Sequence, residues 1–354
     1  MVLPKAPRNW PDEARMDGDA TMTKIEWTDD TLQLTTGCTK VSPGCANCYA
    51  ERMHKRLAGM GRPMYQQPFG EVKCWPHQID KIAKLPAGKK VFINSMSDLF
   101  HEDVPASFIL SAFAAFAQRP DIIFQFLTKR ADRMAPLVGA WIKDGVTFRE
   151  GCSGRLPNNI WLGVTVCNQA EADAKIPLLL QVPAAVRFVS IEPMLGPMDI
   201  RPFIRGGKET YWQCKCGEKA MPLTDETVCK CGDVYDEEWS LNSLSWVICG
   251  GETGPGARPM HPDWVRSLRD QCAVADVPFF FKGWGEWVPR SQLMKVNIDA
   301  PWGTVHETGE FFKTATPWNG HDDDGSGEAI VYRFGKKAAG RVLDGRTWEE
   351  FPNG

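Results

Sequence analysis

Long hydrophobic runs, internal repeats and an excess of charge of one sign are all absent from this sequence. The longest mostly apolar stretch, near residues 108–117, is about half the length that a membrane-spanning helix needs. The N-terminus lacks the basic start and the long apolar stretch of a signal peptide. We therefore expect a cytoplasmic protein with no membrane partner.

The charge is almost balanced. Lys and Arg number 41, Asp and Glu number 44, and the net charge is −3. The chain therefore has no bulk positive field that would attract nucleic acid, although a local basic groove is compatible with this composition. A disordered chain is excluded because 14 Trp and 18 Phe supply ample material for a core.

Short apolar runs alternate with amphipathic stretches along most of the chain. The runs resemble parallel strands that are buried on both faces. They lie at residues 91–94, 122–127, 160–166, 186–191, 246–249 and 278–281, with a shorter first run at 25–27. The stretches that predict helices are 45–57, 105–118, 131–143, 169–181 and 262–273. This alternation predicts an α/β fold, and its six or seven units favour a complete or partial (β/α) barrel over an open doubly wound sheet.

The pattern also divides the chain into parts. Residues 1–22 are polar and aperiodic, which predicts a disordered tail, or an assigned start that precedes the true one near Met22. We assign residues 23–205 and 244–290 to the barrel and residues 206–243 to an inserted subdomain. Residues 291–354 are expected to form an irregular C-terminal extension, in which 310–315 and 329–334 pair as a hairpin.

Twelve cysteines point to metal or redox chemistry, because disulfides are rare in a reducing compartment. Seven of them fall into two groups. The other five are expected to be ordinary buried small side chains. These five are Cys74, Cys152, Cys167, Cys249 and Cys272.

The first group is Cys38, Cys45 and Cys48, with gaps of six and two residues in a loop rich in Gly and Pro. A structural zinc site normally has four ligands, whereas a four-iron cluster held by three cysteines keeps one iron open. The motif also opens a predicted helix, whose N-terminus favours negative charge. We favour an iron–sulfur site. The alternatives are a zinc site completed by His54 or Cys74, or three unrelated cysteines.

The second group is Cys214, Cys216, Cys229 and Cys231, arranged as two Cys-Lys-Cys-Gly knuckles. Four thiolates without a nearby histidine suit tetrahedral zinc. A short polar insertion has too little apolar content to fold unaided, so a metal staple is expected. The prediction is a small zinc-ribbon-like insertion with structural zinc, and a second iron–sulfur site is the alternative.

The segment Gly37-Cys-Thr-Lys-Val-Ser-Pro-Gly-Cys-Ala-Asn-Cys-Tyr49 resembles a bacterial and phage protein family with a three-Cys motif and poorly known function. The resemblance continues through residues 94–104, 126–130, 188–193, 250–259, 335–340 and 343–345. That family is similar to the radical S-adenosylmethionine superfamily, and distantly to spore photoproduct lyase.

The resemblance implies a (β/α) barrel, a 4Fe-4S cluster on Cys38, Cys45 and Cys48, and S-adenosylmethionine on the open iron. It also implies an electron donor as a partner and a setting in bacteria or phage-infected cells. Two departures matter. The commonest first gap in the superfamily is three residues rather than six, and Gly250-Gly251-Glu252 follows a later strand than the superfamily's similar segment.

Polar residues follow nearly every apolar run. In barrel enzymes the active site gathers at the carboxyl ends of the strands, so these residues are candidates for binding a cofactor. Acidic and amide groups suit the amino and ribose hydroxyl groups of S-adenosylmethionine, and a cation suits its carboxylate. A structural salt bridge or turn is the alternative for each one. The candidates are Ser95, Asp98, Lys129, Glu192, Gly250, Gly251 and Glu252.

Two classes of function follow. The favoured one is a radical S-adenosylmethionine-type enzyme that generates a deoxyadenosyl radical, with nucleic acid or a modified base as a guess at its substrate. The other is a non-catalytic, metal-stabilised module that binds nucleic acid or a partner protein encoded nearby. The polar strand ends and the missing fourth ligand favour the enzyme. The sequence singles out no catalytic residue.

Overall fold

A computed structural model describes residues 25–204, 243–293, 300–314 and 327–352, and the backbone of three short strands between residues 211 and 239. The predicted tail and the four cysteines of the insertion lie outside the described residues. Within the described part, every helix is too short or too polar to cross a membrane.

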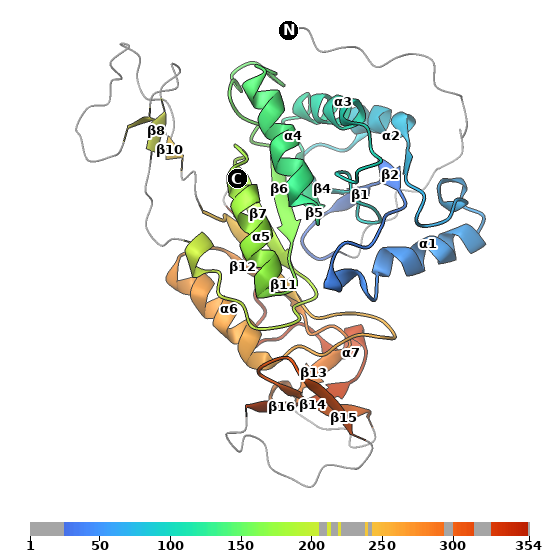
Figure 1. Cartoon of the computed structure of the whole chain (residues 1–354), viewed down its shortest axis with the longest axis vertical. Coiled ribbons are helices and arrows are strands. Elements are labelled where there is room, and N and C mark those ends of the chain that lie inside the picture. The colour runs from blue at the N-terminus through green and yellow to red at the C-terminus, as the bar shows by residue number, and fades with distance from the viewer. Residues whose placement is uncertain are drawn as a thin grey trace.

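The core of the fold is a parallel sheet of seven strands (Figure 1). Its spatial order follows the chain: β1 (Asp30–Leu32), β4 (Lys90–Ile93), β5 (Ile123–Thr128), β6 (Ile160–Thr165), β7 (Val186–Ile191), β11 (Trp246–Gly250) and β12 (Phe279–Gly283). A doubly wound sheet reverses its order at a switch point, whereas a barrel adds each strand beside the last. The two end strands, β1 and β12, do not pair with each other in the described structure, so the sheet is a partial barrel.

Helices connect the strands along one face of this sheet. The crossovers hold α3 (Ala106–Ala117), α4 (Ala131–Lys143), α5 (Gln169–Leu180) and α6 (Pro262–Val274). The segment between β1 and β4 holds a small hairpin of β2 (Thr35–Thr36) and β3 (Lys73–Cys74), with the helices α1 (Tyr49–Gly59) and α2 (Pro76–Asp80). Figure 1 shows α1 standing apart from the outer layer of helices.

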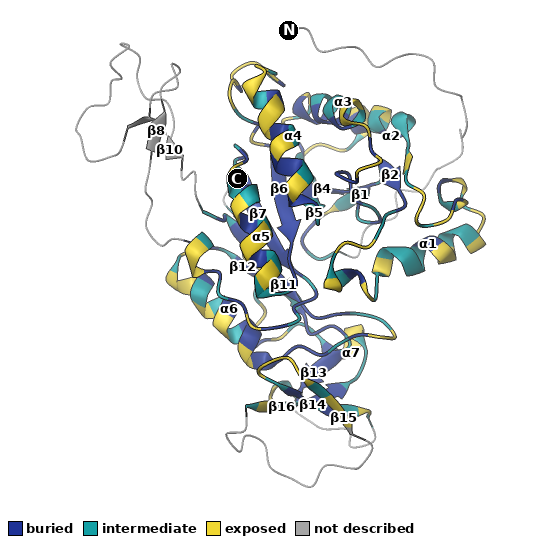
Figure 2. Cartoon of the chain, viewed as in Figure 1, coloured by how far each residue is buried: buried dark blue, intermediate teal, exposed yellow. Residues whose placement is uncertain are grey.

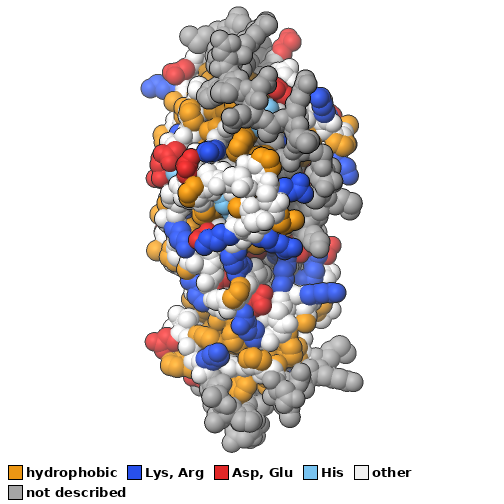
Figure 3. Space-filling model, turned by 90° about the vertical axis from the view of Figure 1, so that its right-hand side faces the viewer, with side chains coloured by type: hydrophobic (Ala, Val, Ile, Leu, Met, Phe, Trp, Pro, Cys, Tyr) orange, Lys and Arg blue, Asp and Glu red, His pale blue; other side chains and the backbone are white. Residues whose placement is uncertain are grey.

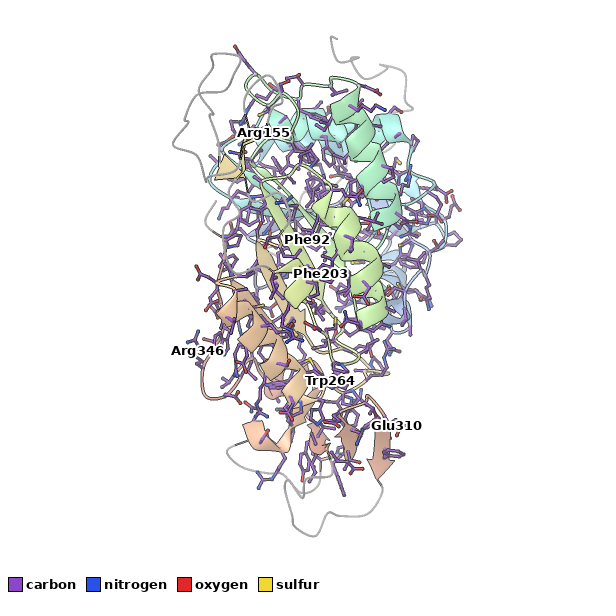
Figure 4. All side chains as sticks on the ribbon, turned by 60° about the vertical axis from the view of Figure 1, so that its left-hand side comes forward. Phe92, Arg155, Phe203, Trp264, Glu310 and Arg346 are labelled. Atoms are coloured by element: carbon purple, nitrogen blue, oxygen red, sulfur yellow. The ribbon has the colours of Figure 1, made fainter. Side chains whose placement is uncertain are left out.

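Two apolar clusters cover the two faces of the sheet. On β7, Val189 and Ile191 belong to the cluster beneath the helices, whereas Phe188 belongs to the inner cluster. Successive side chains of a strand point to opposite faces, so a strand buried on both faces reads as a continuous apolar run. Figure 2 shows these strands as buried along their length. In Figure 4, Phe92 of the inner cluster lies in the middle of the molecule, and Arg346 lies at its edge.

The C-terminal residues close the amino end of the inner cluster. The ring of Phe351 lies 5.2 Å from that of Trp246 and 5.5 Å from that of Phe280. Trp246 Nε1 also donates to the carbonyl of Glu350 at 2.8 Å. Trp246 and Phe280 lie near the beginning of their strands. Phe351 therefore covers the inner aromatic cluster at the amino end of the sheet.

The C-terminal extension is more regular than predicted. It forms a four-stranded antiparallel sheet of β13 (Trp287–Pro289), β16 (Glu328–Arg333), β14 (Trp302–His306) and β15 (Phe311–Thr314), in that order. The short helix α7 (Lys336–Ala339) follows it. The predicted hairpin is wrong, because β14 lies between β15 and β16 and pairs with both. The sequence of β14 is Trp-Gly-Thr-Val-His, which has no continuous apolar run.

One predicted strand is also wrong. Residues 25–27 form a turn, and the first strand of the sheet is Asp30–Leu32. An edge strand needs burial on fewer sides, so β1 tolerates polar side chains that a search for apolar runs passes over. Within the described part, the other predicted strands and helices are confirmed, with ends that shift by a few residues. Helix α1 shifts most, since it begins after Cys48 rather than at Cys45.

Candidate functional site

The strand-end residues predicted from the sequence share one edge of the sheet, because the carboxyl ends of parallel strands lie together. Asp98 follows β4, Lys129 follows β5, Glu192 follows β7 and Gly250 ends β11. Ser95 also follows β4, and its hydroxyl accepts a hydrogen bond from Gln33 Nε2 at 2.8 Å. The strand pairing places these residues at one edge, and their role in binding a cofactor stays a prediction.

The cysteine loop comes to this edge from β2. Gly37 begins the loop with φ of 86°, and a Cβ at this position would collide with the carbonyl of Glu71, so glycine is required. Ser42 caps a short 3₁₀ turn at Pro43–Cys45, since its hydroxyl accepts from Gly44 N at 3.1 Å. This 3₁₀ turn precedes the start of helix α1.

Cys48 caps helix α1, and its sulfur accepts a hydrogen bond from Glu51 N at 3.4 Å. An anionic ligand at such a position gains from the positive end of the helix dipole. The Cys48 sulfur therefore lies at the positive end of α1.

Cys38 lies against a buried ionic network. Arg130 Nη1 donates to Cys38 Sγ at 3.6 Å and to Asp98 Oδ2 at 3.2 Å. Burial raises the pKa of the Cys38 thiol, with a further increase from the Asp98 carboxylate, and the Arg130 guanidinium opposes both. Cys45 contributes to this rise in the pKa of Cys38, as the last of its causes.

The Asp98 carboxylate organises the ends of β4 and β5. Its oxygens accept from Thr128 Oγ1 at 2.7 Å and from the backbone N–H groups of Phe100 and Lys129, both at 3.0 Å. Asp98 is thus a structural centre of this edge. The Lys129 ammonium, by contrast, has no ionic or hydrogen-bond partner among the described residues.

The donors present suit an iron–sulfur cluster in kind. Three thiols come from one loop, beside a helix N-terminus and a guanidinium that offsets thiolate charge. Within the described part of the chain, no three His, Cys, Asp or Glu side chains are arranged so that they could hold a metal ion. The structure therefore does not bring the three sulfur atoms into a finished metal site, and the cluster on Cys38, Cys45 and Cys48 stays a prediction.

Glu192 and Lys282 form an ion pair on the inner face of the half-barrel. Lys282 Nζ lies 2.7 Å from Glu192 Oε1 and 2.8 Å from Oε2. Burial alone would lower the pKa of Lys282, but the carboxylate of Glu192 outweighs it and the pKa lies above its usual value. Gly250 lies between the pair, and a Cβ there would lie 3.3 Å from Lys282 Cβ and 3.5 Å from Glu192 Cδ.

Glu252 ties the glycine loop to the cysteine loop. Its carboxylate receives Arg258 Nη2 at 2.6 Å and Nε at 2.8 Å, and it also receives Asn47 Nδ2 at 3.0 Å. Asn47 stands between Cys45 and Cys48 and reaches the carbonyl of Gly256 at 2.7 Å. Burial would raise the pKa of Glu252, but these hydrogen bonds lower it overall. Glu252 therefore braces the loop, and Gly251 beside it donates its N–H to the carbonyl of Gly283 at 2.9 Å.

The scattered cysteines are mostly buried, as predicted, and Cys74 is half-buried. Cys167 differs in its surroundings because its sulfur lies 3.8 Å from the hydroxyl of Ser42, beneath the cysteine loop. Burial raises the pKa of Cys167 to about 11, so it remains a thiol at neutral pH.

The candidates predicted from the sequence do not include Asn47, Arg258 or Arg130. Arg130 and Asn47 lie within quoted segments, but their partners are 92 and 205 positions away along the chain. The sequence signal that could have indicated these residues was position: Asn47 lies within the cysteine motif, and Arg130 follows a strand end.

Comparison with known proteins gives one family. A family described as a protein of unknown function (DUF5131) matches residues 22–352. None of the curated proteins matches the sequence. Among solved structures, spore photoproduct lyase complexed with dinucleoside spore photoproduct matches with a TM-score of 0.36 and 11% identity, over 90% of this chain and 73% of that one. The family match covers almost the whole described chain, and the protein therefore belongs to the DUF5131 family.

Proposed function

We propose that this protein is a radical S-adenosylmethionine-type enzyme whose reaction takes place at the carboxyl edge of the half-barrel. The observation that carries the proposal is the meeting of a three-cysteine loop with polar strand ends at the carboxyl edge of the sheet. At the opposite, amino end of the sheet, Phe351 packs against the inner aromatic cluster.

Cys38, Cys45 and Cys48 are the residues that would hold a 4Fe-4S cluster. Such a cluster, together with S-adenosylmethionine on its open iron, supplies a 5′-deoxyadenosyl radical for hydrogen abstraction. Arg130 positions Cys38, and Asn47 holds the part of the loop between the other two cysteines. Lys129, whose ammonium has no partner in the described part of the chain, offers a cation for the carboxylate of S-adenosylmethionine. Glu192 offers acceptors for its amino or ribose groups.

The proposal is tested by anaerobic reconstitution with iron and sulfide, followed by reduction and incubation with S-adenosylmethionine. We expect a brown protein with about four irons per chain and the release of 5′-deoxyadenosine. Serine at Cys38, Cys45 or Cys48 should abolish both. Cys74→Ser is the matched control, because this cysteine is half-buried and belongs to the neighbouring hairpin.

Other outcomes would select the alternatives. Loss of metal from Cys74→Ser or His54→Asn would support a zinc site completed by a distant ligand. A colourless protein that holds only zinc would overturn the enzyme and leave the metal-stabilised binding module.

The insertion receives a separate proposal, since its cysteines lie outside the described residues. We propose that Cys214, Cys216, Cys229 and Cys231 hold one structural zinc, which supplies most of the folding energy of residues 206–243. Replacing Cys229 and Cys231 with serine should release about one zinc per chain and leave the iron content unchanged. Loss of iron from this double variant would show that the two sites are not separate.

A further inference from the structure

The face that carries helix α1 is basic, although the whole chain has a net charge of −3. Figure 3 shows Lys and Arg side chains gathered in a band across the middle of this face. Two segments supply such charge. Residues 40–62, which include α1, hold five basic residues and one acidic one, and residues 329–343, which include α7, hold four basic residues and no acidic one.

These two segments meet at the glycine loop. Arg52 of α1 donates to the carbonyl of Thr253 at 3.0 Å, and Arg333 of β16 donates to that of Pro255 at 2.9 Å. Neighbouring carbonyls thus hold both guanidinium groups beside the carboxyl edge of the half-barrel sheet, which we call its mouth. Carbonyls do not neutralise the charge, and the nearest carboxylate to Arg333, that of Glu286, is 3.9 Å away.

In two ion pairs near this edge the acidic side chain lies behind the basic one. In the Arg258–Glu252 pair the arginine side chain is 36% exposed and the glutamate 5%, and in the Lys336–Glu26 pair the values are 49% and 23%. At these two pairs, solvent therefore meets the cation first. A ligand that approaches this mouth experiences a positive surface even where the charges are paired.

An exposed aromatic side chain lies in the same place. Tyr49 directly follows Cys48 and is 53% exposed. On α1, residues 49, 52 and 56 are three and four positions apart, so Tyr49, Arg52 and Arg56 share one stripe of the helix. An aromatic ring among separated cations is the arrangement that binds single strands, where phosphates pair with cations and bases stack on rings.

We propose that single-stranded nucleic acid binds across this basic band, with its backbone on Arg52, Arg56, Arg333 and Lys336 and a base stacked on Tyr49. The inference deepens the proposed function, since it names the substrate class for the same mouth. A strand bound in this way would present one nucleotide to the edge that holds Glu192 and Lys282.

Fluorescence anisotropy with a labelled single-stranded DNA of mixed sequence tests the proposal. The Arg52→Gln/Arg56→Gln variant should bind about tenfold more weakly and should lower the slope of log affinity against log salt by about 1.4, or about 0.7 for each lost phosphate contact. Tyr49→Ala should also weaken binding about tenfold, but it should leave the salt slope unchanged. The matched control is Lys143→Gln/Arg201→Gln, which removes two exposed cations that flank the outer helices.

Duplex DNA, heparin and an acidic peptide serve as competitors. The proposal is overturned if the Arg52→Gln/Arg56→Gln variant binds as the wild type does. It is equally overturned if Tyr49→Ala binds DNA as tightly as the wild type does and if heparin or the acidic peptide displaces DNA equally well from both proteins. Iron content and 5′-deoxyadenosine release are measured on the same samples, so a failure of the proposed enzyme is distinguishable from a failure to bind nucleic acid.

Discussion

The guanidinium group of Arg130 links Cys38 to Asp98, with Nη1 lying 3.6 Å from the sulfur and 3.2 Å from the carboxylate. The same side chain is 5% exposed, and its other nitrogens reach Glu102 at 3.0 Å and Thr39 Oγ1 at 2.8 Å. One buried cation thus fastens the first cysteine of the motif to the ends of two strands. The position of Cys38 depends on this contact rather than on the loop alone.

Arg130→Gln should therefore lower the free energy of unfolding by about 3 kcal/mol, because it leaves the Asp98 carboxylate buried without its cation. Arg130→Lys should recover part of this loss, since it keeps the charge and loses the planar fork. Urea unfolding at neutral pH measures both effects. Arg201→Gln is the control and should change stability by less than about 1 kcal/mol, because its pair with Asp199 is exposed. Equal effects at Arg130 and Arg201 would contradict the assigned role.

The pair of Glu192 and Lys282 should behave as one unit. Glu192→Gln and Lys282→Met should each destabilise the protein, because each leaves a recessed partner without its counter-charge. The double variant should be more stable than the sum of the two effects predicts, with a coupling of about 2 kcal/mol. A double-mutant cycle from chemical unfolding gives this value. Additive effects would mean that the two charges are independently solvated.

The sequence predicted the repeating part of the fold because that part has a simple physical cause. Strands such as β6 and β7 are buried on both faces and read as continuous apolar runs, and helices such as α4 have clear ends. Strands β1 and β14 were missed because their residues are polar or alternate. These strands are defined by their neighbours rather than by their own composition.

The candidate site was predictable in place but not in detail. Parallel strand ends converge, and the strand order places Asp98, Lys129, Glu192 and Gly250 at one edge, while their role as cofactor-binding residues stays a prediction. Their separate roles depend on long-range pairings that leave no local pattern. Glu252 illustrates this. It accepts hydrogen bonds from Arg258 and Asn47, and Asn47 is 205 positions away along the chain.

Asp344 gives the protein an acid-sensitive link between the C-terminal segment and helix α6. Its carboxylate receives Arg266 at 2.9 Å and Arg269 at 2.7 Å, and hydrogen bonding from Arg266 chiefly lowers its pKa to about 2 from an ordinary value of 3.8. A lowered pKa adds stability that is present above the ordinary value and is lost as the pH falls through the folded one. The stability difference between wild type and Asp344→Asn should be constant from neutral pH to about pH 5 and should shrink toward pH 2. Urea unfolding over this range measures it, and a difference that is independent of pH would contradict the prediction.

Phe351 should stabilise the half-barrel from its amino end. Phe351→Ala removes ring contacts with Trp246 and Phe280 and the cation–π contact from Lys90, whose Nζ lies 4.8 Å from the ring centre. Because Phe351 is only half-buried, we expect a loss of about 2 kcal/mol, below the range for a fully buried phenylalanine. Phe312→Ala is the control, because this phenylalanine is 53% exposed. A similar loss at both positions would show that Phe351 does not seal the inner cluster.

A substitution of Lys129 distinguishes a cofactor-binding role from a structural role more clearly than substitutions of the neighbouring residues do. Its backbone N–H is fixed by Asp98, while its ammonium group has no partner among the described residues, so Lys129→Ala should leave stability and iron content unchanged. If the ammonium binds the carboxylate of S-adenosylmethionine, the loss of one charge-assisted hydrogen bond should weaken affinity by about ten- to a hundredfold. Equilibrium binding of S-adenosylmethionine to the reconstituted protein measures this, with Lys143→Ala as a control at the end of α4. Normal affinity in Lys129→Ala would assign this lysine to the substrate, and reduced iron content would assign it to the fold.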